Sequence, residues 1–160
     1  MRPLAVILLA VFLALAVYTG YLYINSQIVI RDIDCTATDA ADQEALFLEL
    51  KGQAAAGTLT GTPFAAEDMG DAADYQFYTY TVFLRNQTFI QAEVAEIQVT
   101  PMNGDVLQLR EENPIAVPAR NDGAVQATIL TRKGMHNVRE LTVTYYLWGL
   151  PFSLRTTYSE

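Results

Sequence analysis

The chain opens with a long run of apolar residues and continues with segments in which apolar and polar residues alternate. From Leu4 to Ile24 there is no charged residue. At about 1.5 Å of rise per residue, these roughly 21 residues form a helix about 31 Å long, which matches the hydrocarbon core of a bilayer. The pattern therefore predicts a transmembrane helix over residues 1–25 and one further domain over residues 26–160.

The residues that flank the apolar run set its expected orientation. Arg2 and the free amine precede the run, and the positive-inside rule keeps such an end in the cytoplasm. Tyr18, Tyr21 and Tyr23 cluster near the other end, where an outer aromatic belt is expected. We therefore expect a single-pass signal-anchor in the cell membrane, with a cytoplasmic N-terminus and an extracytoplasmic C-terminal domain.

Other kinds of N-terminal segment share part of this pattern. A cleaved signal peptide needs a small-x-small site, which Ala14-Leu15-Ala16 supplies, but the apolar run continues past this site without a polar, helix-breaking region. A lipoprotein needs a lipobox, and Cys35 lies well past the run without one. A type IV pilin needs a Glu five residues after its processing point, and the run contains no acid. A membrane anchor fits the sequence better than each of these.

Most of the chain after residue 25 shows the period-two alternation of strands that are buried on one face. In the first such segment, Ile33 and Cys35 fall on one face, and Asp32 and Asp34 fall on the other. Segments rich in Tyr, Val and Ile repeat the pattern down to the C-terminus. About seven strands are predicted, and they span Ile28–Ala37, Tyr78–Leu84, Ala95–Thr100, Val106–Arg110, Val125–Ile129, Val138–Trp148 and Phe152–Tyr158.

Turn-forming residues separate these strands. Asn103-Gly104 suits a tight hairpin with positive φ at both central positions, and Pro114 and Pro118 bracket an edge segment. Short strands separated by turns at intervals of roughly 8 to 12 residues predict an all-β fold, an immunoglobulin-like antiparallel β-sandwich. Further turns are expected at Arg85-Asn86-Gln87, Asn121-Asp122-Gly123 and Gly149-Leu150-Pro151.

One segment between the first two strands has helical rather than strand periodicity. An apolar stripe over residues 42–51 predicts a short helix, which Asp42 caps and Gly52 ends. We expect this helix to cover one end of the sheet. Residues 53–74 are rich in Ala, Gly, Thr and acid without periodicity, and they predict a long loop excursion. The apolar stripe consists of Leu46, Phe47 and Leu50.

The middle of the chain combines three features in a fixed order. The strand Val82-Phe83-Leu84-Arg85-Asn86 ends in Asn, and an Asn-Gly hairpin and a Pro-flanked turn follow it. This order resembles that of bacterial envelope sandwiches of the FxLYD and fibronectin type III kind, over about half of the chain. Such families consist mostly of interaction or accessory modules, so the resemblance implies binding or scaffolding.

The formal net charge of -8 narrows the classes of partner. Nucleic-acid binding requires clustered Lys and Arg, whereas the basic residues here are scattered, with Arg132-Lys133 as the only adjacent pair. An acidic surface also disfavours docking on anionic lipid headgroups. We therefore expect no nucleic-acid partner, and we expect the hydrophobic helix to anchor the protein without a polybasic auxiliary.

Residues with catalytic or metal-binding chemistry form no recognisable motif. His136 and Cys35 are the only residues of their types and lie far apart, which disfavours Cys-His catalysis and structural zinc. We expect His136 in a surface turn and Cys35 as a buried small hydrophobe, with an intermolecular disulfide as the alternative for Cys35. No cofactor, metal site or enzymatic activity is therefore expected.

Three further polar patterns have simple structural interpretations. Acidic residues gather at two places without the spacing of an EF-hand loop, so solvated acids are a simpler interpretation than calcium sites. Glu111 and Glu112 are adjacent and point in opposite directions on a strand, so they cannot flank one glycosidic bond. Asn86-Gln87-Thr88 matches a glycosylation sequon. The two acidic groups are Asp32, Asp34, Asp39 and Asp42, and Glu67, Asp68, Asp71 and Asp74.

Aromatic residues are the remaining candidates for a binding role. They fall on both faces of one central strand and of the last two strands, which is more than one core face absorbs. In the structural interpretation, the second sheet and the predicted helix cover both faces. In the functional interpretation, an exposed face binds a protein or a carbohydrate. The candidate residues for that face are Phe77, Tyr146, Trp148 and Tyr158.

These features favour a membrane-tethered, extracytoplasmic interaction or scaffolding domain of the cell envelope, which is not an enzyme and whose partner is another envelope protein. An adhesin-like or carbohydrate-binding module is the alternative, and it requires exposed aromatic residues. An enzyme with an unrecognised carboxylate site is a third hypothesis, and it requires two acids that converge in a pocket.

Overall fold

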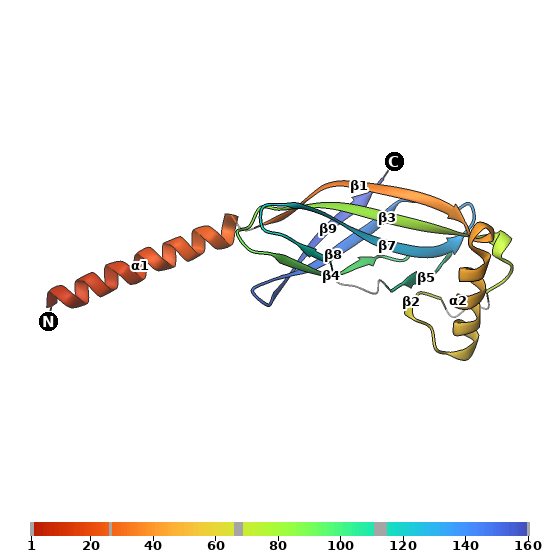
Figure 1. Cartoon of the computed structure of the whole chain (residues 1–160), viewed down its shortest axis with the longest axis horizontal. Coiled ribbons are helices and arrows are strands. Elements are labelled where there is room, and N and C mark those ends of the chain that lie inside the picture. The colour runs from red at the N-terminus through yellow and green to blue at the C-terminus, as the bar shows by residue number, and fades with distance from the viewer. Residues whose placement is uncertain (1, 26, 66–68, 111–114, 160) are drawn as a thin grey trace.

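The computed structural model describes residues 2–25, 27–65, 69–110 and 115–159, and it shows one long helix joined to a two-sheet sandwich (Figure 1). The helices are α1 (Arg2–Asn25) and α2 (Glu44–Ala56), with short 3₁₀ helices at Ala40–Gln43 and Ala72–Asp74. The strands are β1 (Ile28–Asp39), β2 (Gly61–Pro63), β3 (Tyr75–Asn86), β4 (Ala92–Val99), β5 (Asp105–Leu109), β6 (Ile115–Val117), β7 (Asp122–Arg132), β8 (Arg139–Leu147) and β9 (Leu150–Tyr158).

The strands pair antiparallel in two sheets, with the orders β1-β3-β7-β5-β2 and β6-β4-β8-β9. The run β1-β3-β7-β5 has the A-B-E-D order of an immunoglobulin sandwich, and β4-β8-β9 has its C-F-G order. The predicted sandwich is therefore confirmed. The three-residue strands β2 and β6 extend the two sheets at their edges, and β6 is the edge segment predicted before Pro118.

Alternate residues of the central strands fill the space between the two sheets. Tyr80 and Val82 on β3 are fully buried there, as are Leu141 and Val143 on β8. Because successive side chains of a strand point to opposite faces, the predicted alternation assigned these residues to one face correctly. Cys35 on β1 is half-buried and packs against the same core.

The predicted hairpin at Asn103-Gly104 is wrong, because β4 and β5 lie in different sheets. The turn itself is tight: Gly104 has a φ of 96°, and the Asp105 N–H donates to the Met102 carbonyl at 3.1 Å. It carries the chain from one sheet to the other instead of pairing two neighbours. Turn chemistry is the same in both cases, so the sequence pattern does not distinguish a hairpin from a crossover.

The turn between β8 and β9 lies one residue earlier than predicted. Trp148 and Gly149 form it, with φ values of 54° and 75°, and Leu150 and Pro151 already belong to β9. Leu147 pairs with Leu150 across this two-residue loop. Positive φ at both central positions defines a type I′ hairpin.

The helix α2 starts and ends later than predicted. Gln43, and not Asp42, occupies the N-cap position, without a side-chain hydrogen bond. Gly52 lies inside the helix, and Gly57, with a φ of 68°, is the left-handed residue that ends it. The predicted stop at Gly52 is wrong because the strong helix formers Ala54–Ala56 outweigh a single glycine.

The predicted loop excursion over residues 53–74 is also wrong in part. Its first residues continue α2, Gly61–Pro63 forms β2 against β5, and Ala72–Asp74 forms a 3₁₀ turn. These elements are too short for sequence periodicity to reveal them.

A second apolar cluster lies on the outer face of the five-stranded sheet, under α2. Phe47 and Leu50 of α2 are buried in it, as the apolar stripe predicted. Opposite them lie Tyr75, Phe77 and Leu130 of the sheet. The helix therefore covers one end of the sheet, and that end is remote from α1 (Figure 1). We call the end of the sandwich next to α1 the proximal end and the end under α2 the distal end.

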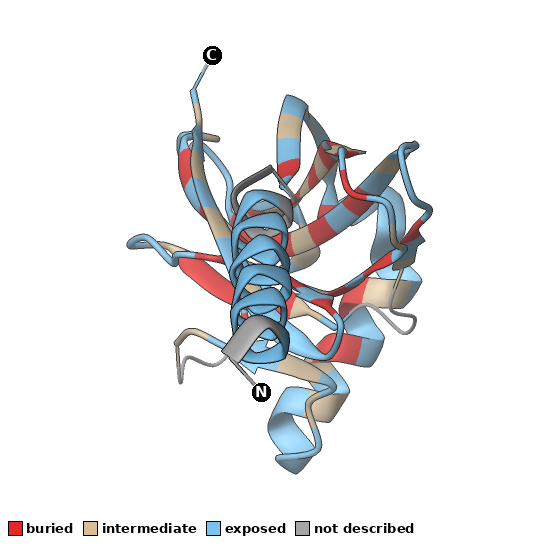
Figure 2. Ribbon diagram, turned by 90° about the vertical axis from the view of Figure 1, so that its left-hand side faces the viewer, coloured by how far each residue is buried: buried red, intermediate tan, exposed pale blue. Residues whose placement is uncertain are grey.

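The helix α1 leaves the proximal end as a separate rod (Figure 1). Its segment Leu4–Tyr21 is long and apolar enough to cross a membrane, and none of it is buried in the protein. Figure 2, viewed from the α1 side, shows this exposure along the helix. Only two residues separate α1 from β1, and the Gln87 N–H donates to the Gln27 carbonyl at 3.1 Å. The junction is therefore tied to a loop of the sandwich.

Candidate functional site

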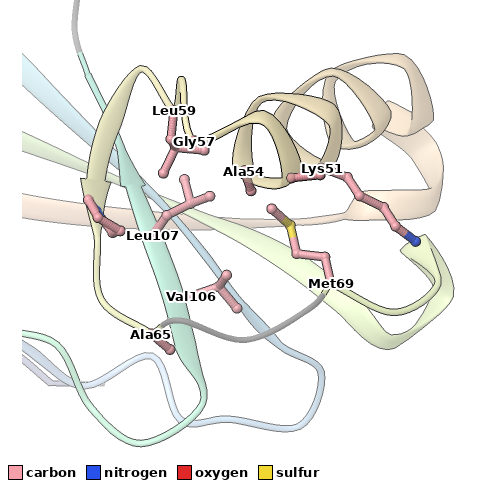
Figure 3. Close-up of a pocket in the computed structure, with 10 residues that line it drawn as sticks. Lys51, Ala54, Gly57, Leu59, Ala65, Met69, Val106 and Leu107 are labelled. Atoms are coloured by element: carbon pink, nitrogen blue, oxygen red, sulfur yellow. The ribbon is translucent and has the colours of Figure 1, made fainter.

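An apolar pocket lies at the distal end, between the second half of α2 and the edge of the five-stranded sheet (Figure 3). Its volume is about 590 Å³, which falls in the range of roughly 300 to 1,000 Å³ of small-ligand sites. Among the described residues, its walls include Ala54 and Ala55 of α2, Leu59 and Met69 of the connections, and Val106 and Leu107 of β5.

The pocket exists because small residues of α2 face larger residues of β5. Ala54 and Ala55 are exposed on the helix and leave space that longer side chains would fill. The pairing of β5 with β7 shifts register between Asp105 and Leu107. Through this bulge, the neighbours Val106 and Leu107 both join the cluster beneath α2. The small side chains of α2 therefore leave an open apolar pocket next to the packed cluster under the helix.

Lys51 is the only charged residue among the described residues that line the pocket. Its ammonium donates a hydrogen bond to the Gly70 carbonyl at 2.7 Å, which holds the side chain at the rim near Met69 (Figure 3). The apolar stem of a lysine covers apolar surface while its charged end stays in water. The pocket therefore suits an apolar group that carries a negative charge at one end.

A close approach of β2 to β5 forms the outer wall of the pocket. A Cβ on Gly61 would strike the Gln108 carbonyl oxygen, so only glycine lets the two strands lie this close. The Gln108 side chain in turn donates to the Ile97 carbonyl and accepts from the Val99 N–H of β4. The wall is therefore built on β5, which these hydrogen bonds attach to β4 of the opposite sheet.

A buried ion pair near the pocket has a structural role. Arg139 Nε and Nη2 donate to Asp105 Oδ2 and Oδ1 at 2.9 and 2.7 Å, and Nη1 donates to the carbonyls of His136 and Val138 at 2.6 and 2.7 Å. Burial alone would lower the pKa of the guanidinium, but Asp105 outweighs burial and raises that pKa above its ordinary value. Within the described residues, every buried side-chain polar atom has a partner, so this pair offers no polar atom to a substrate.

Two tyrosines of β3 hold the connection between β7 and β8. The hydroxyls of Tyr78 and Tyr80 donate to the carbonyls of Met135 and Asn137 at 2.7 and 2.8 Å. Burial, with a smaller contribution from neighbouring Cys35, raises the pKa of the Tyr80 phenol well above its ordinary value. The Tyr80 phenol therefore keeps its proton at physiological pH and holds the connection through its hydrogen bond to the Asn137 carbonyl.

The aromatic face predicted from the sequence does not form as one surface. Phe77 is only 2% exposed and lies under α2, because the helix covers the outer face of its strand. Tyr158 is half-buried, with its ring 5.8 Å from that of Tyr80. Tyr146 and Trp148 are 38% and 62% exposed. Of the candidate aromatic residues, Tyr146 and Trp148 are therefore exposed as the functional interpretation requires. The assignment of Phe77 to an exposed face is wrong.

The other singled-out residues are dispersed. His136 is exposed in the connection before β8, as predicted. Asp39 pairs with Lys133 at 3.1 Å. Across the described part of the chain, no group of three or more His, Cys, Asp or Glu residues is arranged to hold a metal ion. The predicted positions Glu67, Asp68, Glu111, Glu112 and Pro114 lie outside the described residues.

The sequon residue Asn86 is buried and organises the proximal loops. Its amide donates to the carbonyls of Ile90 and Val117 at 2.8 and 3.0 Å, and its oxygen accepts from the Thr88 N–H at 2.9 Å. These bonds use both amide hydrogens, so in the folded domain Asn86 is a structural residue and not a glycan attachment point.

Comparisons with protein-family models and with curated proteins find no match to this chain. The resemblance to FxLYD and fibronectin type III sandwiches therefore stays a prediction. The distal pocket was missed by sequence reasoning, because its walls come from segments that are distant along the chain, and no local pattern shows that they meet. The small residues from Ala54 to Gly57 were the one local signal, since they leave a helix end without large side chains.

Proposed function

We propose that this protein is a membrane-tethered, extracytoplasmic interaction domain of the cell envelope, which is not an enzyme and which binds another envelope protein in its distal pocket. The observation that carries the proposal is that two features lie at opposite ends of the molecule. A helix long enough to cross a membrane joins one end of the sandwich, and an apolar pocket opens at the other (Figures 1 and 3). In this arrangement α1 holds the pocket away from the bilayer.

The orientation in the proposal rests on the charges that flank α1. Arg2 precedes the apolar segment and the acidic domain follows it, and short basic flanks stay in the cytoplasm. The sandwich is then exported. The resemblance to envelope sandwiches that act as accessory modules supports the same location.

The lining of the pocket supports an apolar protein segment as its occupant. Leu59, Val106 and Leu107 offer apolar walls, and burial of apolar side chains contributes about 25 cal/mol per Å². Lys51 at the rim would pair with an acidic side chain or a C-terminal carboxylate of the partner. Binding of this kind requires no chemical step from the domain.

A carbohydrate-binding or adhesin-like module is the second candidate, and the exposure of Tyr146 and Trp148 favours it. Both residues lie toward the proximal end of β8, on the side from which α1 leaves (Figure 1). A glycan on another surface would reach the distal pocket more readily than these residues. The distal pocket is therefore the better candidate for recognition.

Site-specific photo-crosslinking in intact membranes tests the proposal. A photoreactive amino acid at Ala54 faces the pocket, and the same amino acid at Ala56, an exposed residue outside the pocket lining on the same helix, is the matched control. We expect one envelope protein to crosslink from position 54 and not from position 56. With the photoreactive group at Leu59, Ala54→Trp should abolish the crosslink, because the indole fills the pocket.

Two further results in the same preparation separate the hypotheses. Protease added outside the membrane should cut the sandwich, and cutting only from the cytoplasmic side would show that the proposed topology is wrong. Equal crosslinking from positions 54 and 56 would contradict the pocket as the binding site. Saturable glycan binding that Trp148→Ala abolishes would favour the carbohydrate-binding module instead.

A further inference from the structure

The proximal end presents exposed aromatic residues on two loops beside α1. Phe89, between β3 and β4, is 63% exposed, and Trp148 lies in the β8–β9 turn. Ile28 at the start of β1 pairs with Asn86 at the end of β3, so the loop that carries Phe89 begins next to the helix junction. The β8–β9 turn points to the same end of the sandwich (Figure 1).

The short junction keeps these loops close to whatever surface α1 enters. Two residues span at most about 7 Å when fully extended. The hydrogen bond from the Gln87 N–H to the Gln27 carbonyl also ties the junction to the loop of Phe89. A bilayer crossed by α1 would therefore lie within reach of Phe89 and Trp148.

Trp148 has a strained backbone conformation, and so does Arg120 in the β6–β7 connection, whose N–H donates to the Thr88 carbonyl beside Phe89 at 3.1 Å. Among the described residues, Arg120 and Trp148 are the non-glycine residues with positive φ, at 54° each. The Arg120 guanidinium stacks on the Phe89 ring, with its central carbon 4.1 Å from the ring centroid. Burial in the sandwich does not offset the strain at Trp148, because that side chain is mostly exposed. Strain retained at exposed positions indicates a role outside the fold.

We propose that these proximal loops form a membrane-contact face, in which Phe89 and Trp148 insert into the interfacial region of the bilayer that α1 crosses. Arg120, stacked on Phe89, then donates hydrogen bonds to lipid phosphates. This inference rests on the proposed role of α1 as an anchor. It goes beyond that role because it fixes how the sandwich stands on the membrane, with the distal pocket facing away.

The chemistry of the face matches the bilayer interface. Tryptophan concentrates at the level of the lipid headgroups, where one part of its ring is apolar and the N–H stays hydrated. A guanidinium pairs with phosphate through two parallel hydrogen bonds. The net charge of -8 disfavours a broad attraction to anionic lipids, so the contact depends on a few inserted side chains next to the anchor.

Trp148 is the only tryptophan in the chain, so its fluorescence reports on this face directly. The test uses the full chain reconstituted in phosphatidylcholine vesicles that contain lipids brominated near the headgroup end of the acyl chain. The matched control is the variant Trp148→Phe/Leu48→Trp, since Leu48 is 56% exposed on α2 at the distal end. We expect brominated lipids to lower the emission of Trp148 at least about twofold more than that of the control.

Each alternative result contradicts the inference in a recognisable way. Equal emission from both proteins in brominated and ordinary lipids would show that Trp148 does not touch the bilayer. If acrylamide in the water also fails to quench Trp148, a second protein copy covers it instead of lipid. Flotation after an alkaline wash, on the same samples, shows whether α1 anchors the chain. Loss of the protein from the vesicles would overturn the anchor itself, whereas retention without lipid quenching would overturn only the membrane-contact face.

Discussion

Arg139 and Asp105, the first residues of β8 and β5, join the two sheets of the sandwich through a buried ion pair with two parallel hydrogen bonds. Both side chains are almost completely shielded from solvent. Removal of one partner of such an ion pair strongly destabilises the fold, because the other charge is then buried without compensation. The distal ends of the two sheets therefore depend on both residues.

Asp105→Leu or Arg139→Met alone should lower the free energy of unfolding by about 3 to 5 kcal/mol. The double variant should lose much less than the sum of the two, because apolar side chains of similar size leave no buried charge. Urea unfolding of the full chain in detergent, followed by far-UV circular dichroism, measures all three. Strictly additive losses would contradict the coupling between the two residues.

Tyr80 should make the domain less stable at alkaline pH. Its phenol has a raised pKa in the folded state because it is buried, whereas in the unfolded chain the phenol titrates near pH 10, as a rough value. Below that pH both states keep the proton and stability is complete. Above it the unfolded chain loses the proton first, so stability falls by up to about 1.4 kcal/mol per pH unit.

Tyr80→Phe isolates this contribution. At neutral pH the variant should lose about 1 kcal/mol, since the hydrogen bond to the Asn137 carbonyl is gone. Between about pH 10 and 11 its stability should fall less steeply than that of the wild type. Urea unfolding at several pH values measures both slopes, and equal slopes would contradict a buried, neutral Tyr80.

Trp148→Asn should stabilise the isolated fold. Trp148 and Gly149 form a type I′ turn, and Asn-Gly is the preferred pair for such a turn. A bulky residue in the left-handed region costs roughly 1 to 2 kcal/mol, so a gain of about 1 kcal/mol is expected in urea unfolding of the detergent-solubilised chain. Trp148→Phe is the matched control and should show no gain, because the strain remains. A loss of stability in Trp148→Asn would argue against strain at this position.

Gly61→Ala should detach β2 from β5 and open the outer wall of the pocket. The added Cβ meets the Gln108 carbonyl oxygen, so the strands must separate. Because β2 is a three-residue edge strand, the sandwich should stay folded while amide hydrogens of β5 exchange faster by mass spectrometry. Crosslinking from position 54 should fall in parallel.

Gly52→Ala provides the contrast on the neighbouring helix. A Cβ there meets no atom within 4 Å, and replacement of a helical glycine by alanine gains roughly 0.5 to 1 kcal/mol. The exchange of β5 should be unchanged in this variant. Unchanged exchange in Gly61→Ala as well would show that β2 does not depend on the close approach.

The strands were predictable from the sequence where apolar and polar residues alternate over many positions, because one face of the strand is then buried. On β8, Leu141, Val143, Tyr145 and Leu147 all point inward, as the period-two pattern indicates. The same pattern does not reveal what covers the opposite face of a strand. Phe77 was therefore a candidate for an exposed face in the functional interpretation, whereas α2 covers it, as the structural interpretation expected.

The sites were less predictable than the strands because they depend on contacts between distant segments. The pocket requires the bulge at Val106 and the extension of α2 beyond Gly52, and neither follows from local propensity. The ion pair of Arg139 joins residues that are separated along the chain by two strands, so no spacing rule identifies it. The aromatic character of Trp148 made it a candidate from the sequence, whereas only the backbone geometry shows that it lies in a strained turn.

The strand β1 runs without interruption from the α1 junction to the distal end, where the chain enters α2 (Figure 1). It pairs with β3 from Ile28 opposite Asn86 to Asp39 opposite Gln76, with one register shift between Ile30 and Asp32. Because α1 precedes β1 and α2 follows it after a short 3₁₀ helix, tension between the proposed anchor and a partner held by α2 would run along the backbone of β1, and the ladder with β3 would keep that strand extended. If α1 anchors the chain and the distal pocket binds a partner, as proposed, the sandwich is a stiff mechanical link between the two.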